Sequence, residues 1–169
     1  MTSRNPERDR RCHCRNARHP QDPSKYRSAI DFHILYDSSG PDLVRIRREL
    51  TRDDGQTKLV ARPYLLRPDL KRRGRSWDDL VRRIQAVRDT DPVEESRRSL
   101  PSGMLHELRE ALFLGRNLAE ARLKLVRERY QPHINPLLED DSLFWLDEEI
   151  HRTGLQDAID VAEFWEGTA

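Results

Sequence analysis

The residues best able to do chemistry in this chain are its cysteines and histidines. Cys12 and Cys14, with His19, form a C-x-C-x4-H pattern. Thiolate and imidazole groups are zinc ligands, but a structural zinc site uses four ligands, usually as two spaced pairs. No second pair follows this one, so we expect the protein to bind no metal and no cofactor. The sequence leaves open whether Cys12, Cys14 and His19 bind a metal ion.

Three other patterns approach a catalytic or metal-binding motif without completing it. The run HELRE beginning at His106 lacks the second histidine of a zincin helix, and Glu148-x-x-His151 is a single unit where a di-iron bundle needs two. Asp31 and His33 could act as an acid–base pair, but no nucleophile is recognisable beside them. The glycine-rich nucleotide signatures and G-x-S-x-G are also missing from the sequence. An enzyme is therefore the third-ranked hypothesis.

Charge is distributed unevenly along the chain. Residues 1–88 contain 22 Lys and Arg against 12 Asp and Glu, whereas residues 89–169 contain 9 against 18. This asymmetry favours a basic surface for an anionic partner. The alternative is that the two halves pair with each other. Most of the cations are arginines, which suit bidentate phosphate contacts, although a GC-rich genome produces the same bias.

Composition indicates a cytoplasmic protein with a modest core. Hydrophobic and charged residues each make up 36% of the 169 residues. No apolar run approaches the roughly 20 residues that cross a bilayer, and the N-terminus lacks the apolar region of a signal peptide. We expect a disordered basic tail at 1–27, a β-β-β-α basic module at 28–90, a linker at 91–101 and an acidic helical subdomain at 102–169.

Hydrophobic periodicity predicts the elements of an α+β fold. Alternation predicts strands at 28–36, 43–52 and 57–66, with Asp54-Gly55 as the hairpin turn between the last two. The expected sheet is a three-stranded antiparallel meander with 43–52 in its centre and an apolar face of Val44, Ile46, Leu50, Leu59 and Leu65. A helix over 76–88, capped by Ser76, backs this face. Further helices are predicted over 102–130, interrupted at Gly115, and over 141–152 and 155–166, with a capping box at Thr153 and Gln156.

The predicted register gives the sheet a cationic solvent face. His33, Arg47 and Arg62 would form one cross-strand row, next to a row that includes Arg45 and Tyr64. Like charges placed opposite each other are destabilising and call for a carboxylate or an anionic ligand. The loop 71–75 adds cations just before a helix N-terminus, where anions bind. The predicted phosphate-binding residues are Arg45, Arg47, Arg62, Lys71, Arg72, Arg73 and Arg75, with Tyr64 able to stack on bases.

The leading hypothesis is a non-enzymatic protein that binds, or is associated with, nucleic acid through this face and loop. The acidic C-terminal helices would engage a protein partner or mask the basic face. The runner-up is a protein–protein adaptor or regulator, and no membrane role is expected.

Overall fold

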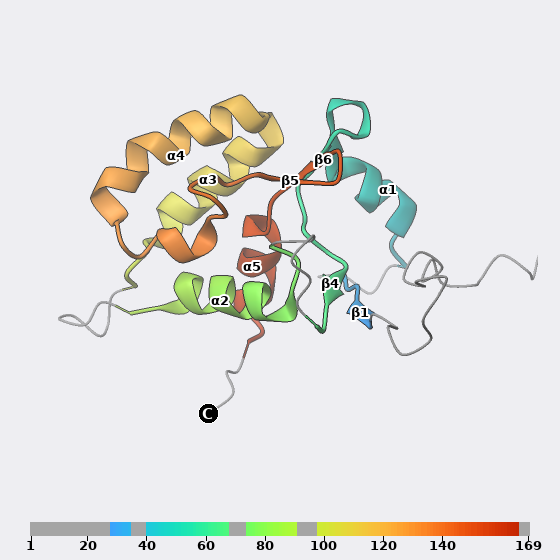
Figure 1. Cartoon of the computed structure of the whole chain (residues 1–169), viewed down its shortest axis with the longest axis horizontal. Helices are drawn as coiled ribbons and strands as arrows, with labels where there is room; N and C mark the ends of the chain where they lie inside the picture. The colour runs from blue at the N-terminus through green and yellow to red at the C-terminus, as the bar shows by residue number, and fades with distance from the viewer. Residues whose placement is uncertain (1–27, 35–39, 68–73, 91–97, 166–169) are drawn as a thin grey trace, which may run out of the picture.

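The computed structural model describes residues 28–34, 40–67, 74–90 and 98–165, and over these ranges the chain has an α+β fold with a helical C-terminal portion. The predicted tail at 1–27 and most of the predicted linker lie outside the described residues. Figure 1 shows the long helices gathered on one side of the molecule, with the first helix and the short strands on the other.

The described residues form five α-helices and six short strands. The helices are α1 (Leu43–Glu49), α2 (Trp77–Arg88), α3 (Ser102–Leu114), α4 (Arg116–Tyr130) and α5 (Leu155–Ala162). The strands are β1 (Ala29–Ile30), β2 (Thr51–Arg52), β3 (Thr57–Lys58), β4 (Tyr64–Leu65), β5 (Trp145–Asp147) and β6 (Ile150–Arg152). Short 3-10 turns occupy Asp53–Gly55 and Asn135–Leu137.

The strands form two small sheets. β1 and β4 make an antiparallel pair, and the second sheet has the order β2-β3-β6-β5. In that sheet β3 runs parallel to β6, while the other neighbours are antiparallel. The parallel pair joins the two halves of the chain, since β3 belongs to the basic half and β6 to the acidic half.

Helix α2 organises the core. Leu80, Ile84 and Val87 recur on one face of α2 and are almost fully buried, and the helix packs against α5 and β4. Ser76 caps α2 as predicted, because its hydroxyl accepts a hydrogen bond from the Asp79 amide while the Asp79 carboxylate accepts from the Ser76 amide. The core therefore continues from the N-terminal half into the C-terminal helices.

The predicted three-stranded meander is wrong, although its turn is correct. Asp53–Gly55 turns the chain, and Thr51 pairs with Lys58 in the predicted register. Residues 43–49 are helical instead of extended, because Asp42 caps α1 by accepting hydrogen bonds from the amides of Val44 and Arg45. Of the predicted strand 28–36, the described residues 28–34 contribute only β1, which pairs with β4. The apolar face predicted for 43–52 is not buried: α1 has no buried residue.

The helix predicted over 141–152 is also wrong. This segment forms the β5–β6 hairpin, and Glu148 turns the chain with a φ of 61°. The break at Gly115 and the helix after Gly154 are confirmed. The predicted capping box does not form, because the Gln156 side chain contacts Asp160 and Arg109 instead. None of the helices in the described ranges is long and apolar enough to span a membrane.

Candidate functional site

Two residues of the predicted cationic face are buried inside the molecule. The side chain of Arg62 lies with its Nε 3.0 Å from Asp157 Oδ1, and the Tyr64 hydroxyl donates to Asp157 Oδ2 at 2.9 Å. Arg62 is 8% exposed, and Tyr64 and Asp157 are 0% exposed. The expectation that Arg62 and Tyr64 present themselves to solvent is therefore wrong.

Arg75 is likewise used internally. Its Nη1 donates to Asp147 Oδ2 at 2.7 Å, and the same carboxylate oxygen accepts from Arg152 Nε at 2.7 Å. All three side chains are buried. Arg75 is thus removed from the predicted phosphate-binding loop, while Lys71, Arg72 and Arg73 of that loop lie outside the described residues.

The remaining predicted residues, Arg45 and Arg47, lie on the exposed surface of α1. Arg45 donates to Glu49 at 2.8 Å, one helical turn away. Arg47 donates to Asp31 at 3.1 Å, and its side chain keeps 58% of its surface exposed. Exposed pairs of this kind contribute about 0–1 kcal/mol, so they are readily exchanged for a stronger anion.

Part of the predicted row does come together, although not on one sheet. His33 Nδ1 lies 3.5 Å from Arg62 Nη1. Burial lowers the pKa of His33, and the positive charges of Arg62 and Arg47 lower it further against the opposing effect of Asp31. The imidazole is therefore neutral at physiological pH and adds no cation to the surface.

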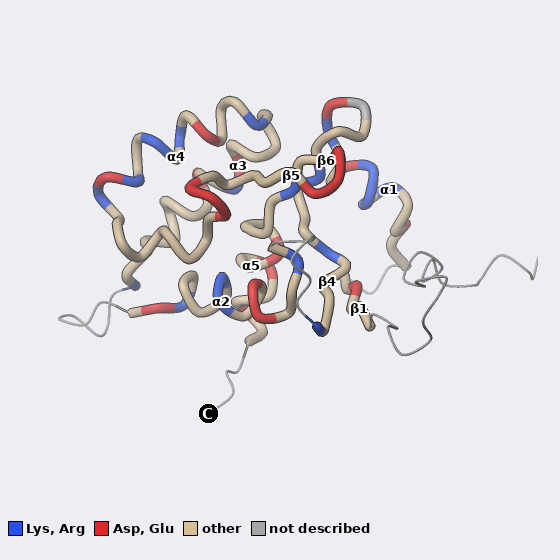
Figure 2. The backbone as a smooth tube through the Cα atoms, viewed as in Figure 1, with Lys and Arg blue, Asp and Glu red and all other residues tan. Residues whose placement is uncertain are grey.

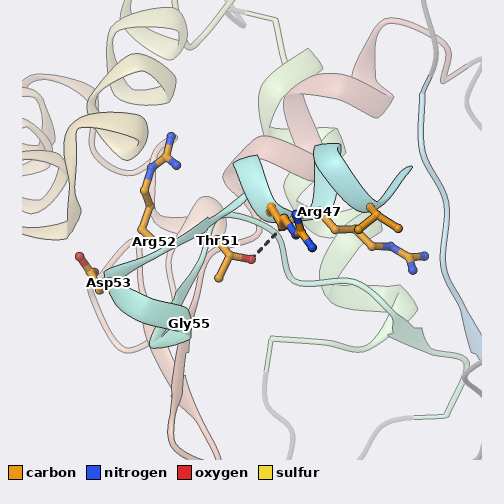
Figure 3. A pocket seen from close by; sticks show the side chains of 7 residues that line it. Arg47, Thr51, Arg52, Asp53 and Gly55 are labelled. Atoms are coloured by element: carbon orange, nitrogen blue, oxygen red, sulfur yellow. Dashed lines mark hydrogen bonds between the residues drawn. The ribbon is translucent and has the colours of Figure 1, made fainter. Parts of the chain in front are cut away.

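An open hollow of about 780 Å³ lies beside Arg47. Figure 3 shows its lining, in which Arg47 and Arg52 occupy opposite ends with Thr51 between them. α1 and the β2 turn supply all of the lining residues, which are Val44, Arg47, Arg48, Thr51, Arg52, Asp53 and Gly55. We call this the arginine hollow.

The arginine hollow carries more positive than negative charge. Arg48 is exposed and has no ion-pair partner within the described ranges, and Arg52 lies over the Phe113 ring with its Cζ 5.7 Å from the ring centroid. Among the lining residues named above, the acid is Asp53, whose carboxylate accepts a hydrogen bond from the Thr57 hydroxyl at 2.7 Å. The hollow therefore offers three guanidinium groups to an anion.

A further cation, Lys58, lies on the strand next to the hollow wall. Lys58 is paired across the sheet with Thr51 of the hollow wall and with Arg152 of β6. Burial lowers the pKa of Lys58, and the neighbouring Arg152 and Arg75 lower it further. Burial is the largest cause of this lowering, and Lys58 is not among the residues that line the hollow.

Sequence reasoning missed Arg48 and Arg52 as site residues. In the predicted strand 43–52, alternation would place Arg48 on the apolar face between Ile46 and Leu50, where its charge conflicts with its neighbours. That conflict was the available signal, because a charged residue that breaks a strand pattern also fits a short exposed helix. The sequence around Arg52 gives no sign that it is a site residue, because its place in the hollow depends on the turn at Asp53–Gly55.

Within the described ranges, no group of three or more His, Cys, Asp or Glu side chains could hold a metal ion. Cys12, Cys14 and His19 lie outside these ranges.

A scan of protein-family models gives no match to the chain, and a search of curated proteins gives none either.

Proposed function

We propose that this protein binds nucleic acid, without catalysis, by holding backbone phosphates in the arginine hollow. The observation that supports this most directly is the presence of Arg47, Arg48 and Arg52 around one open concavity. Guanidinium groups match phosphate oxygens in geometry, and clustered arginines attract a polyanion through electrostatics that depend little on sequence. A nucleic-acid ligand fits the cytoplasmic location expected from the sequence.

The test compares two double variants with equal changes in charge. Replacing Arg47 and Arg48 by Gln removes two cations from the arginine hollow, and both side chains are exposed, so the fold should be retained. The control replaces Arg122 and Arg129 of α4 by Gln. Binding to a mixed-sequence fluorescent oligonucleotide is measured by anisotropy at several salt concentrations.

The hollow variant should bind all sequences more weakly and flatten the dependence of log affinity on log salt by up to about two units. The α4 control should retain most of the affinity and the wild-type slope. Equal losses in both variants would show that the contact is not located in the hollow. A wild-type protein that binds no oligonucleotide at low salt would overturn the proposal.

A protein–protein adaptor remains the second candidate, and one observation favours it. Leu118 and Leu125 of α4 are 49% and 73% exposed and lie seven residues apart, on one face of the helix. An apolar stripe of this kind is suited to a partner helix. A complex that survives nuclease treatment and is lost on replacing both leucines by Lys would favour the adaptor.

A further inference from the structure

The four-stranded sheet carries a row of residues that ends beside the arginine hollow. Arg52 of β2 is paired with Thr57 of β3, Thr57 with His151 of β6, and His151 with Leu146 of β5. Residues directly opposite each other in a sheet point to the same face. Arg52, a wall residue of the hollow, therefore shares a face with His151.

The corner between α3 and α4 lies against this face. Phe113, near the end of α3, lies beneath the guanidinium of Arg52, and Arg116, the first residue of α4, donates to His151 Nε2. Burial lowers the pKa of His151, and Arg116 lowers it further against a smaller opposing effect of Asp53, so the imidazole is neutral and able to accept this hydrogen bond. One aromatic ring and two guanidinium groups thus gather at the edge of the hollow.

Phe113 is the aromatic side chain at this edge that a ligand can reach. It is 36% exposed, whereas Tyr64, the aromatic expected to stack on bases, is fully buried. Aromatic rings stack on nucleobases at about 1–3 kcal/mol per base, and arginine planes add to this stacking. Paired bases inside a duplex do not present their faces in this way.

We propose that the ligand is single-stranded nucleic acid, with one base stacked on the Phe113–Arg52 pair while neighbouring phosphates lie in the arginine hollow. This inference rests on the proposed function and narrows it to a class of nucleic acid. It also gives Arg52 two roles, since its charge contributes to the phosphate site and its plane contributes to the base site.

The experiment separates stacking from charge with three probes. They are a fluorescent twelve-nucleotide oligothymidylate, a DNA hairpin with a twelve-base-pair stem, and inorganic polyphosphate, which has phosphates but no bases. Phe113→Leu keeps an apolar side chain and removes the ring. The matched control is Phe164→Leu, which makes the same change at an exposed phenylalanine after α5. Arg52→Lys provides a second test, because it keeps the charge and removes the plane.

The wild type should bind the oligothymidylate more tightly than the hairpin at equal salt. Phe113→Leu should weaken oligothymidylate binding about 5- to 150-fold and leave polyphosphate binding unchanged. Arg52→Lys should weaken oligothymidylate binding more than polyphosphate binding, because it keeps the charge and removes the plane, and Phe164→Leu should change neither affinity.

Two results would overturn the inference and leave the proposed function standing. One is equal affinity of the wild type for hairpin and oligothymidylate, and the other is unchanged oligothymidylate binding in both Phe113→Leu and Arg52→Lys. Failure of the proposed function itself appears differently, as wild-type binding to none of the three probes at low salt. Urea unfolding of each variant establishes whether it is folded. If Phe113→Leu is not folded, the result for Arg52→Lys decides between the outcomes.

Discussion

Buried arginines are the most unusual individual residues of this protein. Arg83 has no exposed surface: its Nη1 donates to the Gly74 carbonyl at 2.8 Å, its Nη2 lies 2.7 Å from Glu139, and it lies over the Trp145 ring. A buried guanidinium is tolerated only when its charge and its N–H groups find partners. Each of these arginines therefore depends on particular acceptors supplied by other segments.

Asp157 is the ion-pair partner of Arg62. Its Oδ2 accepts from the Ala61 amide at 2.8 Å and from Tyr64, while Oδ1 faces Arg62. Burial raises the pKa of Asp157, and Arg62 and these hydrogen bonds oppose the rise. Oδ2 is the hydrogen-bond acceptor, and Oδ1 lies 3.0 Å from Arg62 Nε, an arrangement that suits the carboxylate.

Replacing Asp157 by Asn should therefore lower the free energy of unfolding by about 3–5 kcal/mol, because Arg62 would stay buried without its counter-charge. Urea unfolding at neutral pH measures this change. Asp141→Asn is the control: its carboxylate pairs with Arg127 at the surface, where the expected change is about 0–1 kcal/mol. Equal effects of the two substitutions would show that the buried pair contributes no more than the exposed one.

Among the elements, helix α2 has the start that is best defined by its own sequence. Burial pushes the pKa of Asp79 upward, but the hydrogen bonds from Ser76 and the charges of Arg83 and Arg82 outweigh it, so the pKa lies below its usual value. A carboxyl with a lowered pKa stabilises the fold above the pKa it has in the unfolded chain, about 3.9, and this contribution is lost as the pH falls.

Ser76→Ala should cost about 1 kcal/mol at pH 7, because it removes the cap and one of the bonds that keep Asp79 ionised. The cost should shrink as the pH falls below about 3.9, where Asp79 becomes protonated in the unfolded chain and then in the folded one. Urea unfolding at several pH values measures this trend. Ser102→Ala, at the start of α3, is the control and should not destabilise, because Ser102 is exposed and α3 has no side-chain cap. A cost for Ser76→Ala that is the same at all pH values would contradict the role given to Asp79.

The elements that could be predicted from sequence are those whose own residues define them. α2 has its cap, its acidic first turn and its apolar stripe in one segment, and the break between α3 and α4 occurs at Gly115, where φ is 117°. α1 buries nothing, so hydrophobic periodicity could not reveal it, and the capping residue Asp42 was the signal overlooked. The β5–β6 hairpin depends on burying Asp147 against Arg75, a partner 72 residues away.

The candidate site was predicted in part for the same reason. Arg45 and Arg47 lie on the surface whether their segment is a strand or a helix. Their exposure was therefore predicted correctly although the secondary structure was not. The interior position of Arg62 depends on Asp157, which lies 95 residues away in sequence. Asp157 follows the buried start of α5, but Asp160 lies one turn later on the same helix, so the local sequence does not show which acid pairs with Arg62.

At the scale of the whole molecule, some of the opposite charges of the two halves form ion pairs inside the fold. Arg62 pairs with Asp157, Arg75 with Asp147 and Arg83 with Glu139, and in every pair the cation comes from the basic half and the acid from the acidic half. Figure 2 shows basic and acidic segments lying close together in the centre of the molecule. The pairing of the two halves with each other, left open by the sequence, accounts for these residues, and the arginine hollow holds part of the remaining positive charge.

This arrangement makes folding of either half depend on the other. We expect a fragment of residues 1–97 to fold poorly by itself, because Arg62, Arg75 and Arg83 would lack their acids and α2 would lose its packing against α5. An unpaired buried charge costs about 3–5 kcal/mol, so three of them approach or exceed the 5–15 kcal/mol that stabilises a typical domain. A fragment of residues 98–169 would face the converse problem with Asp147 and Asp157.

Neither fragment should show a cooperative urea transition in near-ultraviolet circular dichroism, whereas an equimolar mixture should recover one. Asp157→Asn in the second fragment should weaken that reassembly, and a cooperative transition in either fragment alone would show that the halves are separate folding units.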